Sequence, residues 1–107
     1  MTSDRFRRLA LDLPGATERQ HMSHPDFRVE GRIFATLGYP DENWGLVKLN
    51  PEQQRSFLSR APGTFRPCKG KWGEQGATNV ELSSAKIAIV RAALKTAWGN
   101  IMERTTA

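Results

Sequence analysis

The sequence predicts an α+β fold in which an antiparallel sheet of about five to six strands packs on N- and C-terminal helices. Apolar residues recur at helical spacing near both ends of the chain, and short segments of alternating polarity lie between them. The connections between the central segments are too short for parallel crossovers. The expected order is α-β-β-β-β-α-β-β-α, in a single domain over residues 1–107.

The first helix is expected directly after the start of the chain, with Ser3 as its N-cap. Steps of three and four place four apolar residues on one helical face: Phe6, Leu9, Ala10 and Leu13. Pro14 and Gly15 then end the helix.

Four extended segments are expected next, of which the first has the weakest strand pattern. They cover residues 17–21, 25–30, 33–37 and 44–49. Alternation in the second segment places Phe27 and Val29 on one side of the sheet. The second and third segments are predicted to form a hairpin around Glu30 and Gly31.

The second helix is expected to begin after Asn50, which can cap it, with Pro51 at the first helical position. Two further strands, over residues 64–68 and 77–82, flank a glycine-rich loop at residues 69–76. Ser83 or Ser84 can cap the last helix. That helix has a broad apolar stripe: Ile87, Val90, Leu94, Ala97, Trp98 and Ile101.

The sequence lacks the features of membrane-spanning proteins, of secreted proteins and of the common enzyme families. No apolar run approaches the roughly 20 residues that span a bilayer. The start carries no apolar signal region, and a single cysteine cannot form an internal disulfide, so a cytoplasmic location is expected. Neither a serine-nucleophile motif nor a phosphate-binding glycine loop is present, and a non-enzymatic protein without a cofactor is expected.

Three residues are weak candidates for metal or thiol chemistry. His21 and His24 lie three apart, but residues three apart in one strand point to opposite faces, and a zinc site needs more ligands. Cys68 would need a neighbouring base to act as a nucleophile, and nothing in the sequence provides one. We therefore expect no metal site and no catalytic residue.

The basic residues are distributed unevenly. Residues 1–50 carry seven basic and seven acidic side chains, whereas residues 51–107 carry nine basic and four acidic ones. Between Glu52 and Glu74 there are five cations and no acid. Such a segment attracts phosphates or other polyanions, although a solvated basic surface would have the same composition.

Trp72 is the aromatic residue for which the sequence allows two roles, one in binding and one in packing. It follows Lys69 and Lys71 in the glycine-rich segment, where cations could neutralise phosphates while the indole stacks on a base or sugar. The alternative is that Trp72 folds back over the core. Trp44 and Trp98 are expected in the core.

A series of short motifs covers nearly the whole chain. In order they are Leu13-Pro14-Gly15-Ala16, His24-Pro25-Asp26-Phe27-Arg28-Val29, Gly31-Arg32-Ile33-Phe34-Ala35, Val47-Lys48-Leu49-Asn50-Pro51-Glu52-Gln53, Lys71-Trp72-Gly73, Thr78-Asn79-Val80-Glu81-Leu82 and Ala97-Trp98. In these motifs the chain resembles the MmcQ/YjbR family of small bacterial proteins. The resemblance implies a frataxin-like (CyaY-like) fold of the "double wing" type, a DNA-binding role and no catalytic residues. Iron delivery is not expected, because the first helix carries more arginines than acids.

The leading hypothesis is therefore a non-enzymatic protein that binds DNA mainly through its phosphates. Arg66, Lys69 and Lys71 are the expected phosphate contacts, with Trp72 stacking. The second choices are the strand cations Arg28, Arg32 and Lys48. The alternative is a module that binds a small anionic ligand or a protein partner.

Overall fold

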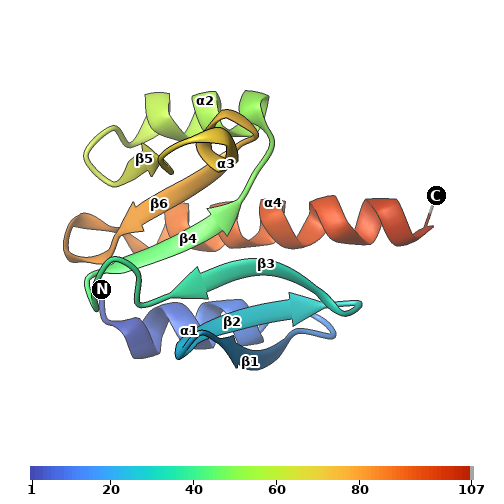
Figure 1. Ribbon diagram of the computed structural model, residues 1–107. Coiled ribbons are helices and arrows are strands. Elements are labelled where there is room, and N and C mark those ends of the chain that lie inside the picture. The colour runs from blue at the N-terminus through green and yellow to red at the C-terminus, as the bar shows by residue number, and fades with distance from the viewer. Residues whose placement is uncertain (107) are drawn as a thin grey trace.

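The computed structural model describes residues 1–106, which form one six-stranded antiparallel sheet with helices on both faces (Figure 1). The strands are β1 (Thr17–His21), β2 (His24–Val29), β3 (Arg32–Leu37), β4 (Trp44–Lys48), β5 (Phe65–Pro67) and β6 (Ala77–Glu81). The helices are α1 (Ser3–Leu11), α2 (Pro51–Arg60), α3 (Lys71–Glu74) and α4 (Ile87–Thr106), with a 3₁₀ turn η1 (Leu82–Ser84). In space the strands follow the order β1-β2-β3-β4-β6-β5.

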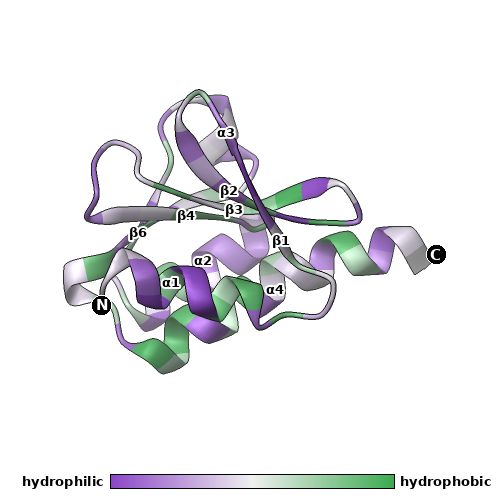
Figure 2. Cartoon of the chain, turned by 90° about the horizontal axis from the view of Figure 1, so that it is seen from below, coloured by the Kyte–Doolittle hydropathy of each residue, from purple (hydrophilic) through white to green (hydrophobic). Residues whose placement is uncertain are grey.

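The predicted α+β class and order of elements are confirmed, with the helix α3 and the 3₁₀ turn η1 as additions. The glycine-rich segment expected to be a loop contains the short helix α3. It crosses the face of the sheet opposite to α1, α2 and α4, as Figure 2 shows. This placement makes α3 part of the surface that the long helices leave open.

Two-residue turns join the first three strands. Glu30 and Gly31 both have positive φ, as a type I′ turn requires, which confirms the predicted hairpin between β2 and β3. Met22 and Ser23 also have positive φ and join β1 to β2. β1 is an edge strand with every residue exposed, and Figure 2 shows it hydrophilic throughout. A polar, charged edge discourages pairing with other chains.

A register shift between β2 and β3 changes which residues face the core. Phe27 pairs with Ala35 while Arg28 pairs with Ile33, so Phe34 is the extra residue of a bulge. Phe34 and Ala35 are therefore both fully buried, although they are neighbours in one strand. Simple alternation would have placed one of them on the open face.

The core lies between the sheet and the long helices α1 and α4. α4 packs on β2, β3 and β4 and contacts α1. Phe6 of α1 approaches β4 so closely that a Cβ at Gly45 would meet its ring at 2.9 Å. α2 covers β5 and β6 on the same side of the sheet. The opposite face carries α3 together with polar side chains and the half-buried Trp44 and Leu46 of β4.

The ends of the helices differ in detail from the sequence-based expectations. Thr2, rather than Ser3, caps α1 by accepting a hydrogen bond from the Arg5 amide. Asn50 caps α2 as predicted, in a capping box with Gln53. α4 begins at Ile87, after a 3₁₀ turn that includes both serines expected to cap it, and Ile87 itself is exposed.

None of the helices in residues 1–106 is both long enough and apolar enough to cross a membrane.

Candidate functional site

A cleft of about 1110 Å³ opens at the end of the sheet where β3 and β4 separate. These strands pair only over Ala35–Leu37 and Gly45–Val47, and beyond those residues they diverge (Figure 1). The β2–β3 turn forms one wall, and the end of β4 forms the other. The C-terminal half of α4 forms the floor, and α3 stands at the rim.

The walls of this cleft are mainly cationic. Four basic side chains line it, from β2, β3, β4 and α4 respectively: Arg28, Arg32, Lys48 and Arg104. Glu103 is the one acid in the lining. Among residues 1–106, no ion pair is formed by Arg32, Lys48 or Arg104. These three cations are therefore available to an anionic ligand, and we call the site the cationic cleft.

Arg28 differs from the other three because a buried carboxylate holds it. Asp26 is fully buried and accepts hydrogen bonds from Arg28 Nε at 2.8 Å and Nη2 at 3.1 Å. Its Oδ2 also lies 2.8 Å from His21 Nδ1 on β1. The hydrogen bond from Arg28 lowers the pKa of Asp26, burial opposes this, and the contact with His21 lowers it further. The ionised Asp26 thus fixes the direction of the Arg28 guanidinium.

Trp72 stands on α3 at the rim of the cleft, with 67% of its surface exposed. The alternative that Trp72 folds back over the core is wrong, because its side chain is largely exposed. Gly73 lies so close to the Cys68 carbonyl that a Cβ would overlap it. Buried Gln54 donates from Nε2 to the Gly73 carbonyl at 3.0 Å and so ties α3 to α2.

The floor of the cleft is apolar and bordered by amides. Ile33, Leu49, Ala77, Ala97 and Ile101 contribute the apolar surface. Asn100 exchanges two hydrogen bonds with Gln53, at 2.8 and 2.9 Å, and these bonds join α4 to α2. Asn100 also donates to the Lys48 carbonyl at 3.4 Å, so α4 in the floor of the cleft is joined to the end of β4 in its wall.

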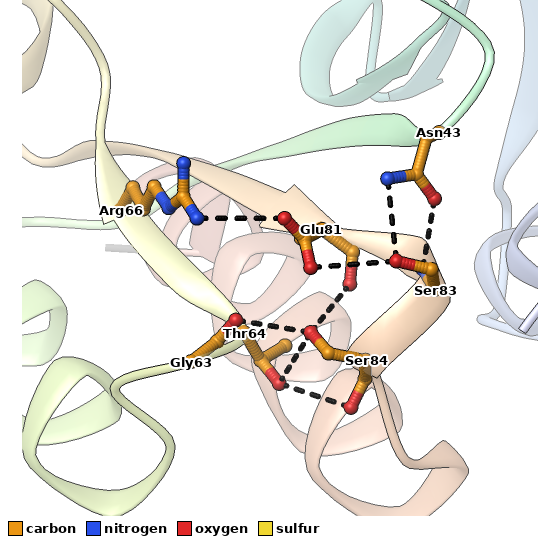
Figure 3. A network of polar contacts seen from close by, with 7 residues as sticks. All are labelled: Asn43, Gly63, Thr64, Arg66, Glu81, Ser83 and Ser84. Carbon is orange, nitrogen blue, oxygen red and sulfur yellow. Dashed lines mark hydrogen bonds and ion pairs between the residues drawn. The ribbon is translucent and has the colours of Figure 1, made fainter.

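Arg66 lies outside the cleft and is already engaged. Its Nη2 lies 3.4 Å from Glu81 Oε2, and its guanidinium lies 5.1 Å from the centre of the Trp44 ring. Hydrogen bonds connect Glu81 to Ser83 and Ser83 to Asn43 (Figure 3). Ser84 is hydrogen-bonded to Glu81, Thr64 and Gly63 and so joins the same network. Arg66 therefore takes part in a network that joins β5, β6 and the loop before β4, and because its side chain remains exposed, its contact with phosphate stays a prediction.

The two lysines of the glycine-rich segment are exposed but do not line the cleft. Lys69 precedes α3 and Lys71 begins it. Neither lysine forms an ion pair within the described part of the chain. They are close to Trp72 in the sequence, whereas the second-choice cations Arg28, Arg32 and Lys48 line the cleft itself.

Sequence reasoning missed two residues that matter here. Arg104 joins the cleft only because the end of α4 reaches beneath the diverging strands. Asp26 accepts a hydrogen bond from Arg28 on the same face of β2. This pair could have been predicted, because residues two apart in a strand point to the same face. The expectation that His21 and His24 point to opposite faces is wrong, because they pair across the β1–β2 turn. Within residues 1–106, no cluster of three or more metal-ligating side chains occurs.

Cys68 is half-buried next to β5, and its backbone amide donates to the Ala77 carbonyl at 2.9 Å. Trp44 and Trp98 are half-buried rather than fully in the core. Trp98 donates from Nε1 to the Pro14 carbonyl at 2.9 Å, on the helical side of the sheet. The three tryptophans thus occupy three distinct environments.

Comparison with known proteins gives a consistent result. The family model named YjbR matches residues 11–100. The Deinococcus radiodurans protein DR2400, described as having a DUF419 domain, has a similar structure with a TM-score of 0.79 at 16% sequence identity. The match covers 97% of this chain and 80% of that one. No curated protein matches the sequence. Because the family model spans most of the length of the sequence, this chain belongs to the YjbR family.

Proposed function

We propose that this protein is a non-enzymatic DNA-binding module whose cationic cleft receives the phosphodiester backbone. The observation that carries the proposal is the convergence of three unpaired cations, Arg32, Lys48 and Arg104, on one hollow. Phosphates are the groups that such a concentration of positive charge attracts most strongly. The predicted cytoplasmic location is consistent with access to DNA.

The arrangement of the cations supports a strand-like ligand. The three free cations come from β3, β4 and α4, so they stand on different sides of the cleft. Successive phosphates along a backbone could each meet one of them. Exposed Lys69 and Lys71 would extend the positive surface past Trp72. Arg28 would contribute less net charge, because Asp26 already balances it.

A salt titration tests the proposal. We would measure the affinity for a fluorescently labelled DNA oligonucleotide by anisotropy over a range of salt concentrations. Log K should fall linearly with log salt, by about 0.7–0.9 for each phosphate contact. The double variant Arg32→Ala/Lys48→Ala should bind more weakly and show a shallower slope. Arg55→Ala/Arg91→Ala, which removes two exposed cations of α2 and α4 outside the cleft, is the matched control.

Two results would refute this function. One is the absence of DNA binding even at low salt. The other is an equal reduction of the slope by Arg55→Ala/Arg91→Ala and by Arg32→Ala/Lys48→Ala, since the binding would then come from diffuse surface charge.

A second candidate, a binding module for a small anion, is favoured by one specific feature. The cleft combines its cations with an apolar floor and the amides of Asn50, Gln75 and Asn100, as pockets for small molecules often do. Thermal-shift measurements with a panel of anionic metabolites would separate the two. A metabolite that raises the melting temperature while DNA does not would favour the second candidate.

A further inference from the structure

We infer that the cationic cleft accepts an unpaired nucleotide strand rather than a duplex. This inference rests on the proposed DNA-binding function and adds to it the form of DNA that is bound. It is drawn from three features of the cleft: the exposed indole of Trp72, the apolar part of the floor, and the free cations Arg32 and Lys48 on the walls with Arg104 at the end of α4.

Trp72 is a stacking surface that is held in place. Its ring is exposed at the rim, whereas the backbone beneath it is fixed by the Gly73–Cys68 contact and the hydrogen bond from Gln54. Gln54 also donates to the Ala77 carbonyl at 3.0 Å and to Thr78 Oγ1 at 3.2 Å, so α3 is anchored to β6 as well. Because the backbone that carries the ring is anchored, stacking of a base on Trp72 costs only the rotational freedom of its side chain.

The floor of the cleft does not suit a phosphate. Leu49, Ala97 and Ile101 are buried apolar residues that line it beneath the rim. A phosphate placed against them would lose its hydration without gaining a partner. The face of a nucleobase, in contrast, gains from contact with apolar surface and keeps its polar edge free for the side-chain amide of Gln75 in the lining.

A nucleic acid would match the free cations, the apolar floor and the Trp72 indole together if it presented phosphates and bases side by side. A duplex keeps its bases stacked in the interior, so it could meet the cations but would leave Trp72 and the floor without a partner. An unpaired strand presents both groups to one surface. The composition of the cleft therefore complements a single strand.

Anisotropy measurements at one ionic strength test the inference with three labelled ligands of equal length: an oligothymidylate, a duplex and an abasic strand. The protein should bind the oligothymidylate more tightly than the duplex. Trp72→Ala should weaken oligothymidylate binding about 5- to 150-fold, the effect typical of one lost stacking contact, and should leave the abasic strand unchanged. Trp72→Phe should restore part of the loss.

Tyr39→Ala is the matched control, because Tyr39 is exposed to 66% and lies outside the cleft. It should bind all three ligands as the wild type does. If the duplex binds as tightly as the oligothymidylate, or if Trp72→Ala weakens binding of the abasic strand equally, the inference is wrong and the DNA-binding function stands. If none of the three ligands binds, the proposed function itself fails. Thymidine monophosphate binding as tightly as the strand would instead assign the cleft to a small ligand.

Discussion

Asp26 is the residue whose environment most constrains the cleft. Its carboxylate is fully buried, yet both oxygens have partners, because Arg28 reaches it from the same strand and His21 from β1. A buried charge persists only when it is paired and hydrogen-bonded in this way. Asp26 thus connects the edge strand β1 to a cation of the cleft, although it does not line the cleft itself.

Replacing Asp26 by Asn should destabilise the protein. The amide keeps the shape but loses the charge and presents a donor to the donors of Arg28, so we expect a loss of about 1.5–3 kcal/mol. Urea unfolding at neutral pH measures it. Asp4→Asn is the matched control, since the carboxylate of Asp4 is 81% exposed in its pair with Arg7 and should contribute at most about 1 kcal/mol. Equal losses in the two variants would contradict this account of Asp26.

The same carboxylate should make stability depend on acidity. The folded protein holds the pKa of Asp26 below its ordinary value of 3.8, mainly through the hydrogen bond from Arg28. Its contribution is therefore fully present above about pH 4 and is lost as the pH falls through the folded value. The difference in unfolding free energy between wild type and Asp26→Asn should shrink across this acid range. A difference that is constant or grows on acidification would contradict the assignment.

Among the elements, α3 carries the feature that distinguishes this cleft from a plain basic surface. The glycines around it were predicted to form a flexible loop, since three glycines in eight residues usually mean a turn. In the structure they allow close approach instead, because only a residue without a side chain fits beside the Cys68 carbonyl at position 73. A flexible loop and a tightly packed short helix can have the same glycine-rich sequence, so the sequence alone does not distinguish them.

A pair of glycine substitutions tests the packing of α3. Gly73→Ala should destabilise the protein by about 1–3 kcal/mol, because its methyl group would overlap the Cys68 carbonyl and force α3 to move. Gly99→Ala, within α4 and with nothing beyond its own stretch of helix within 4 Å of the new methyl group, should stabilise it by about 0.5–1 kcal/mol. Urea unfolding of both variants provides the comparison. A neutral Gly73→Ala would mean that α3 is not packed as described.

At the scale of the whole molecule, the sequence predicted the order of helices and strands much better than which of their residues lie together in the cleft. The order of elements could be predicted because hydrophobic periodicity, the Asn50 cap and the Glu30–Gly31 turn are local signals. The cleft depends instead on how far β3 and β4 remain paired and on where the end of α4 passes beneath them. Both depend on tertiary packing between distant segments. As a result Arg104 lines the cleft, whereas Arg66 lies outside it and pairs with Glu81.

The central claim is that DNA occupies the cationic cleft, and the three indole N–H signals of the protein test it most directly. Trp72 lines the cleft, Trp44 lies under Arg66 near β5, and Trp98 binds the Pro14 carbonyl on the helical side of the sheet. In a titration of ¹⁵N-labelled protein with an oligothymidylate, followed by NMR, the Trp72 indole signal should shift while those of Trp44 and Trp98 stay in place. A titration that moves the Trp44 or Trp98 signal and leaves that of Trp72 unchanged would contradict it.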